Sequence, residues 1–215
     1  MTSIASAGKS GFTRRRVVIG AAVIALVGAI ALDTTVVKVG SDADLRQQAF
    51  DPDTFGQEEF PRIRDFVTSR APDAVTLANE LAADKKAAIE AYGTQAGAFP
   101  VMAVTFTGTV GEGKSGIFDV NVEGMPDGTR IRVQTGPAIN GTELRDVPGD
   151  IEFGAFKNQI EYQDAGAGIN RAMSEETLSD LDRDALSGKT ISVTGAFTMI
   201  NPKSWLVTPV AHEVP

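Results

Sequence analysis

The densest group of polar side chains in this sequence of 215 residues lies between positions 145 and 162. It combines carboxylates, amides, a guanidinium and a phenol: Arg145, Asp146, Glu152, Asn158, Gln159, Glu161 and Tyr162. Such groups donate and accept hydrogen bonds, and beside an aromatic ring they are typical of sites that hold sugars and other polar small molecules. The candidate ligand-binding residues are therefore Arg145, Asp146, Asn158, Glu161 and Tyr162.

Two other interpretations of the same residues stay open. Glu152 and Glu161 could act as general acid and general base in glycoside hydrolysis, which needs carboxyl groups about 5 to 10 Å apart. Alternatively, Arg145 and Asp146 form an ion pair, while Asn158 and Glu161 satisfy backbone groups around a loop. The first interpretation makes the protein a hydrolase, and the second gives these residues a structural role only.

The sequence lacks the residues that several other kinds of site need. The sequence has no Cys, which excludes disulfides, thiolate zinc sites, iron–sulfur clusters and cysteine nucleophiles. Its only His, His212, falls in a predicted strand, where a solitary imidazole is most simply structural. With one His, no Cys, no calcium loop and no phosphate-binding Gly-rich loop, we expect no metal and no cofactor. Trp205 is expected to close one end of a β-barrel or, if exposed, to stack on a sugar.

The first 33 residues have the pattern of an export signal. Lys9 and the arginines at 14–16 precede an apolar run over residues 17–32, which Asp33 ends. A run of about 16 apolar residues fits a signal peptide or a short membrane anchor. The positive-inside rule then places the rest of the chain outside, which in a bacterium is the periplasm or the cell exterior. Cleavage after the small-residue triplet at 29–31, and export by a twin-arginine signal, both stay open.

The charge distribution supports this division. Residues 1–32 contain four of the 20 basic residues and none of the 28 acidic ones, so the remainder carries a net charge of about −12. An acidic domain stays soluble, and it lacks the basic surface that binds nucleic acid or anionic lipid head groups. We therefore expect no nucleic-acid partner.

Hydrophobic periodicity divides the chain into four parts. Residues 1–32 form the signal or anchor, 33–58 a tether with an extended start at 34–39, 59–97 a helical extension, and 98–215 a β domain. Apolar spacings of three and four predict one helix from Glu59 and a second that opens at Pro72 and Asp73 and ends at Gly93.

Beyond residue 98 the period changes to two, as in β-strands. The predicted order is strands at 101–110, 117–122 and 130–134, turns at 111–114 and 126–128, a loop at 136–150, helices at 153–173 and 174–181, and strands at 190–199 and 205–214. In the third strand, alternation places Arg130 and Arg132 on one face and two aliphatic residues on the other. Three meandering strands, a helical insertion and a closing hairpin predict an α+β fold with a small antiparallel OB-like β-barrel.

The sequence also resembles a known family. The stretches at 136–146 (GPAINGTELRD), 156–162 (FKNQIEY), 194–198 (TGAFT) and 208–210 (TPV) are similar to a bacterial family of unknown function described as predicted periplasmic lipoproteins. The resemblance implies an envelope protein, often encoded near ABC-type sugar uptake systems, with no established activity. A lipoprotein signal needs a Cys, so the lipid modification does not transfer to this sequence.

These observations favour a non-enzymatic periplasmic protein, held at the inner membrane by its N-terminal helix or released after signal cleavage. It is expected to act as an accessory or ligand-binding module for a carbohydrate-related molecule. The alternatives are an interaction domain that docks a sugar ABC transporter component and, less favoured, a carboxylate-based hydrolase.

Overall fold

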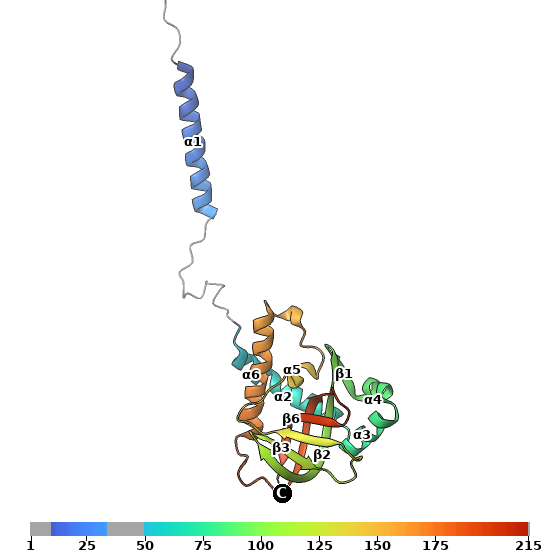
Figure 1. Ribbon diagram of the computed structural model, residues 1–215. Coiled ribbons are helices and arrows are strands. Elements are labelled where there is room, and N and C mark those ends of the chain that lie inside the picture. Colours follow the sequence, from blue (N-terminus) through green and yellow to red (C-terminus); the bar gives the residue numbers. More distant parts are fainter. Residues whose placement is uncertain (1–9, 34–49, 215) are drawn as a thin grey trace, which may run out of the picture. The chain divides into compact units, whose positions relative to one another are not determined.

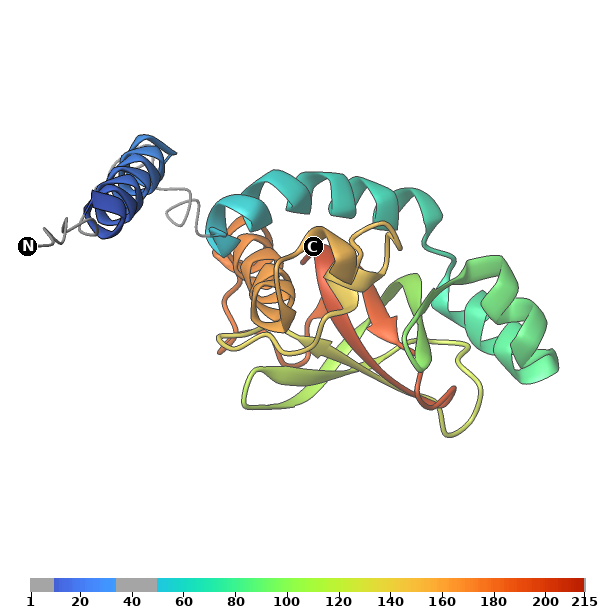
Figure 2. The same cartoon turned by 90° about the horizontal axis from the view of Figure 1, so that it is seen from above.

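The computed structural model describes residues 10–33 and 50–214, and the chain divides into two compact units, Met1–Ala49 and Phe50–Pro215. The first unit contains helix α1 (Ser10–Asp33) (Figure 1). The second contains all the other described elements, with helices packed around one strongly curved sheet (Figure 2). The predicted extended stretch at 34–39 and the tether up to residue 49 lie outside the described residues.

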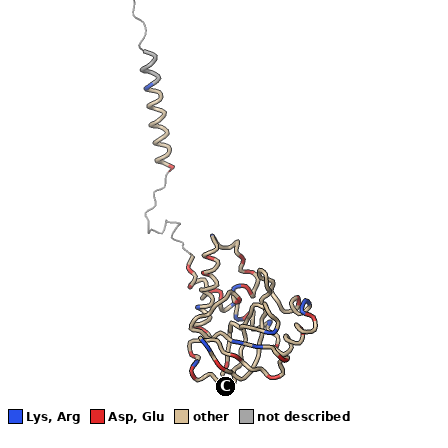
Figure 3. The backbone as a smooth tube through the Cα atoms, in the orientation of Figure 1, with Lys and Arg blue, Asp and Glu red and all other residues tan. Residues whose placement is uncertain are grey.

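Helix α1 has the properties expected of a signal or anchor. Residues Arg16–Asp33 have a mean hydropathy of 2.1, and their side chains are exposed. At 1.5 Å per residue these 18 residues cover about 27 Å, close to the thickness of roughly 30 Å of a bilayer's hydrocarbon core. Figure 3 shows charge in the described part of this helix only near its two ends. The expected N-terminal apolar helix is therefore confirmed, and by length and composition it can cross a membrane.

Helix α2 (Pro52–Arg70) begins at Pro52 rather than at the predicted Glu59. The Asp51 carboxylate accepts hydrogen bonds from the backbone N–H groups of Asp53 and Thr54, and Pro52 occupies the first turn, where its missing N–H costs nothing. The last part of the predicted tether, up to residue 58, is thus helical. The predicted apolar face is confirmed, since Phe60, Ile63 and Val67 are fully buried.

The second predicted helix is divided in two, α3 (Ala74–Ala83) and α4 (Lys85–Tyr92). Asp84 separates them because its extended backbone ends α3 while its carboxylate accepts from the N–H groups of Lys86 and Ala87. Asp73 caps the start of α3 in the same way, and Gly93 follows the end of α4, both as expected.

Six strands form a sheet that closes on itself. They are β1 (Gly93–Ala96), β2 (Phe99–Lys114), β3 (Ile117–Asn121), β4 (Arg130–Gln134), β5 (Thr190–Thr198) and β6 (Ser204–Glu213). The order is β1-β2-β3-β4-β6-β5, and pairing of β5 with β2 completes a ring of five strands. Four pairs in the ring are antiparallel, and β4 runs parallel to β6. The α+β fold with an OB-like barrel is confirmed, with this parallel pair as a correction to a wholly antiparallel barrel.

The turn between β2 and β3 lies later than predicted. Residues 111–114 belong to β2, which bulges between Val110 and Gly113 and pairs Lys114 with Ile117. The chain reverses at Ser115 and Gly116, whose φ angles of 53° and 75° suit a tight two-residue hairpin turn. A glycine-rich stretch can lie in a bulged strand as readily as in a turn, and here the bulge bends β2 around the barrel.

The helical insertion also differs from its prediction. The loop after β4 contains a short helix, α5 (Glu143–Asp146), and a single 3₁₀ turn, η2 (Phe153–Ala155). A single long helix, α6 (Gln159–Leu178), follows. Ser174, predicted to begin a second helix, lies inside α6, because Asn158 caps the helix start and the apolar side chains Ile169 and Met173 keep one face buried.

Helices α2 and α6 approach each other closely. The α2 backbone at Gly56 and the α6 backbone at Gly168 leave no room for a Cβ atom, since one added at Gly168 would lie 1.8 Å from the Pro52 carbonyl oxygen. The barrel core contains Trp205, which is fully buried and stacks on Phe197 with ring centroids 4.7 Å apart. Burial confirms that Trp205 is a core residue, and the alternative that it is exposed to stack on a sugar is wrong.

Candidate functional site

The predicted binding residues all lie around α5 and the start of α6. Arg145 is buried, and its Nε donates to Asp146 at 2.8 Å while its Nη1 donates to the Tyr162 carbonyl at 2.9 Å. Its Cζ lies 3.6 Å from the centroid of the Tyr162 ring. Asp146 also accepts from the Thr142 hydroxyl at 2.6 Å. Three of the five predicted residues therefore meet in one buried contact between the two helices.

The other two predicted residues cap α6. Oδ1 of Asn158 accepts from the backbone N–H groups of Ile160 and Glu161, and the Glu161 carboxylate accepts from the Lys157 N–H. The ion pair and the loop contacts considered from the sequence are thus both present. None of the cavities described below is lined by the five predicted residues. Their role in binding stays a prediction, as does the acid–base pair of Glu152 and Glu161.

A buried polar network that the sequence did not reveal lies beside this contact. The Gln134 side chain donates to the Asn140 carbonyl and to the Thr208 hydroxyl, and it accepts from the Asn140 N–H. Oε1 of Glu143 accepts from the Thr198 hydroxyl at 3.2 Å, while its Oε2 is buried without a hydrogen-bond partner among the described residues. Burial raises the pKa of Glu143 above its usual range.

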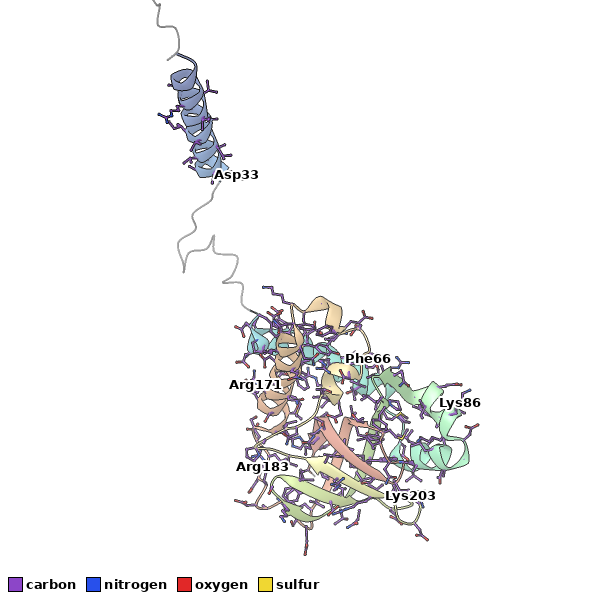
Figure 4. All side chains as sticks on the ribbon, turned by 45° about the horizontal axis from the view of Figure 1, so that its top comes forward. Asp33, Phe66, Lys86, Arg171, Arg183 and Lys203 are labelled. Atoms are coloured by element: carbon purple, nitrogen blue, oxygen red, sulfur yellow. The ribbon has the colours of Figure 1, made fainter. Side chains whose placement is uncertain are left out.

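Two open cavities lie over β3 and β4. One has a volume of about 510 Å³ and a second about 390 Å³, and they share Glu112, Asp119 and Arg130. We call the two together the β3–β4 groove. Its polar and charged lining residues are Glu112, Lys114, Ser115, Asp119, Asn121, Asp127, Thr129, Arg130 and Arg132. Lys203, whose carbonyl accepts from the Arg130 N–H, marks one end of β4 (Figure 4).

An ion pair holds the middle of the β3–β4 groove. Nε and Nη2 of Arg130 donate to the two carboxylate oxygens of Asp119 at 2.5 and 2.7 Å, and this pairing lowers the pKa of Asp119. Arg132 makes one long hydrogen bond, from Nη2 to the Ser204 hydroxyl at 3.3 Å. Its Nε is buried and has no partner among residues 10–33 and 50–214. A buried N–H without a partner is costly.

The sequence contained a signal for this groove. Alternation in β4 predicted Arg130 and Arg132 on one face, and the structure confirms it, because Ile131 and Val133 on the other face are buried in the barrel. Nothing in the sequence showed that β3 would place Asp119 beside these arginines. His212 stands apart from the groove, half-buried in β6, and burial lowers its pKa.

Comparison with known proteins decides the family. Residues 21–213 match the family described as "Predicted periplasmic lipoprotein (DUF2291)". The chain belongs to this family. Its members are predicted periplasmic lipoproteins of unknown function, and the resemblance stated from the sequence is confirmed. The N-terminal signal-like helix agrees with that location, although none of the 215 residues is a Cys that a lipid could modify.

A solved structure shows the same fold. The domain is similar to an OB-fold protein from Thermotoga maritima, solved at 1.90 Å resolution, with a TM-score of 0.61 and 20% sequence identity. The similarity covers 78% of this chain and 99% of the other. At this identity the similarity establishes the fold alone. No functionally curated protein matches the chain.

Proposed function

We propose that this family member is a non-enzymatic envelope protein that binds a carbohydrate-like polar ligand in the β3–β4 groove. The observation that carries the proposal is an open groove lined by hydrogen-bonding side chains, in which the Arg130–Asp119 ion pair lies beside Arg132. The proposed site thus lies on β3 and β4 instead of in the predicted cluster at 145–162. We place it there because the side chains of that cluster already make internal contacts.

The position of the groove supports a ligand role. OB-fold proteins bind oligonucleotides and oligosaccharides on the face of their second and third barrel strands. Counting from β2, these strands are β3 and β4, which form the groove. The acidic charge of about −12 after residue 32 disfavours a nucleic acid, whose phosphates need a basic surface.

The groove chemistry suits neutral or weakly acidic sugars. Its guanidinium groups donate, its carboxylates accept, and Asn121 does both, which matches hydroxyl groups that donate and accept at once. The ion pair with Arg130 keeps Asp119 ionised at neutral pH, so Asp119 is unsuited to protonating a leaving group. Both features favour binding over hydrolysis.

We also propose that α1 is not cleaved from the chain and that it anchors the domain at the outer face of the inner membrane. The helix is apolar over residues Arg16–Asp33, and the sequence has no Cys for a lipid anchor, so the helix supplies the tethering. A ligand of this kind fits an accessory of sugar uptake. Alkaline extraction of bacterial membranes tests the anchor, since an uncleaved chain stays in the membrane fraction at its full mass.

The ligand is tested by thermal-shift measurements on the full chain in detergent micelles, with a panel of neutral sugars, uronic acids and sugar phosphates. A ligand that binds only the folded protein raises its melting temperature. We expect Arg132→Met and Asn121→Ala to abolish the shift and Lys86→Met, an exposed charge on α4 (Figure 4), to preserve it. A shift lost only in Asn158→Ala would return the site to residues 145–162.

A further inference from the structure

One end of the compact unit exposes large apolar side chains. Phe153 in η2 is 50% exposed and Ile160 in the first turn of α6 is 70% exposed. Figure 1 shows this part of the chain, in orange, projecting beyond the barrel. We call residues 153–160 the aromatic tip. Both side chains belong to the segment that leads into α6, and large exposed apolar side chains gathered in one segment are typical of interaction surfaces.

The aromatic tip is held in place by rings beneath it. Phe156 packs against Phe50, Phe55 and Tyr162, with ring centroids 5.4 to 5.6 Å apart. Phe153 packs edge-on against Tyr162 at 5.6 Å. The Asn158 cap fixes the start of α6 between them. The exposed side chains therefore project from a supported platform.

The chain enters the unit at this same platform. Phe50 is the first described residue after α1, and its ring lies 5.4 Å from both Phe55 and Phe156. A segment from Asp33 to Phe50, even fully extended, spans at most about 60 Å. If α1 spans the membrane, the aromatic tip thus lies next to the point at which the anchored chain enters the unit.

We propose that the aromatic tip inserts Phe153 and Ile160 into the interfacial region of the bilayer that holds α1. This rests on the anchoring included in the proposed function. Aromatic and aliphatic side chains partition favourably into that region, and a covalent anchor makes even a weak contact effective by keeping it at high local concentration. The contact would fix the orientation of the domain and of its β3–β4 groove relative to the membrane.

The charge of the aromatic tip defines which lipid surface it suits. Glu152 and Glu161 flank it, Asp164 follows, and Asp150 precedes it in an ion pair with Arg62, so that these acidic residues outnumber the one basic residue of the tip, Lys157. These carboxylates are repelled by anionic head groups. The tip therefore prefers a zwitterionic surface, unlike the many basic peripheral proteins that need anionic lipid.

Because the sequence has no Cys, single-cysteine variants allow a direct test. The full chain is reconstituted in phosphatidylethanolamine and phosphatidylcholine vesicles, with a nitroxide label at Phe153→Cys or Ile160→Cys. Ile200→Cys is the matched control, since Ile200 is 63% exposed and precedes β6 on the loop that contains Lys203. Figure 4 shows Lys203 at the far side of the unit from the start of α2. Flotation with the vesicles first confirms the anchor independently of the tip.

We expect collisions with oxygen, relative to those with a water-soluble nickel chelate, to rise several-fold at 153 and 160 on reconstitution and to stay unchanged at 200. Adding phosphatidylglycerol should reduce the rise. The bilayer contact is refuted if the chain floats with the vesicles but the labels at 153 and 160 stay as accessible to the chelate as the label at 200. Equal protection at 200 would refute it as well. The emission of the buried Trp205 reports that each variant is folded.

Discussion

The guanidinium of Arg145 lies over the Tyr162 ring, with Cζ 3.6 Å from its centroid, while Nη1 donates to the carbonyl of the same residue. A side chain from α5 thus holds the first turn of α6 by a ring contact and by a hydrogen bond. The Asp146 carboxylate neutralises the buried charge at 2.8 Å. A contact of this kind joins the loop after β4 to the helix that covers the barrel.

Arg145→Ala is expected to lower the free energy of unfolding by about 3–5 kcal/mol, because it leaves a partly buried carboxylate without its partner. Arg145→Lys should recover only part of the loss, since an ammonium group cannot stack and donate in the same geometry. Urea unfolding followed by Trp205 emission measures both. As a control, Arg62→Ala removes an exposed ion pair with Glu59 and Asp150 and should cost less than about 1 kcal/mol. Equal losses in Arg145→Ala and Arg62→Ala would contradict the role of the buried contact.

Gly168→Ala should destabilise the protein by about 1–3 kcal/mol, because a Cβ there overlaps the Pro52 carbonyl and forces α2 and α6 apart. Gly166→Ala in the same helix is the matched control. Its Cβ would meet nothing closer than 3.5 Å, so the gain in helix propensity should leave stability unchanged or raise it by up to about 1 kcal/mol. Thermal unfolding separates the two variants, and similar melting temperatures would show that the helices do not pack as described.

Asn158→Ala is expected to cost about 1 kcal/mol, because it removes the acceptor for two backbone N–H groups at the start of α6. Asn158→Asp should retain the cap, and it adds a negative charge at a helix N-terminus, where such a charge is favourable. Chemical unfolding of the three proteins measures the difference. A loss in the Asp variant equal to that in the Ala variant would argue against a capping role.

Stability should depend on pH through Glu143. Burial raises the pKa of Glu143 in the folded protein above 4.5, the ordinary value of a glutamate side chain. The folded protein therefore holds a proton that the unfolded chain releases. This contribution is present below pH 4.5 and is lost as pH rises through the folded pKa. We therefore expect the stability of the wild type, relative to Glu143→Gln, to fall as pH rises above about 4.5. Melting temperatures of both proteins, recorded from pH 4 upward, give this difference.

The comparison with Glu143→Gln at each pH removes other titrations. His212, whose pKa burial lowers from 6.5, gives stability that is lost as pH falls, and it is common to both proteins. Asp51 and Asp119 have pKa values lowered from 3.8, so the stability that they contribute is lost only as the pH falls below about 3.8. A difference that does not change with pH would mean that Glu143 titrates normally in the folded protein.

Arg132→Met should change the free energy of unfolding by less than about 1 kcal/mol, although Arg132 is partly buried. It removes an unpartnered N–H together with one long hydrogen bond, and these effects oppose each other. A residue that contributes little to stability but is needed for ligand binding is typical of a functional site. Urea unfolding of the ligand-free protein measures the change, and a loss above about 2 kcal/mol would assign Arg132 a structural role instead.

Much of the fold could be predicted from local pattern. The periods of two and 3.6, together with the order of strands and helices, predicted the meander, the helical insertion and the closing hairpin. The predicted boundaries of helices and strands were wrong where the same residues suit two kinds of local structure. The Asp51–Pro52 pair indicates a turn as well as a helix start, and the glycines at 111 and 113 suit a bulge as well as a turn.

The candidate site was harder to predict, because it depends on contacts between distant parts of the chain. The alternating pattern predicted that Arg130 and Arg132 share one face of their strand. Asp119 lies beside them only because β3 pairs with β4. The dense polar cluster at 145–162 suggested a binding site, and its side chains instead bond to one another and to backbone groups. The sequence by itself determined the apolar N-terminal helix, the acidic exported domain, the family and the barrel order, since these follow from composition and short-range periodicity. Only the tertiary structure decided which polar side chains are satisfied internally and which, such as Nε of Arg132, have no partner in the described chain, because burial and long-range pairing are properties of the folded molecule.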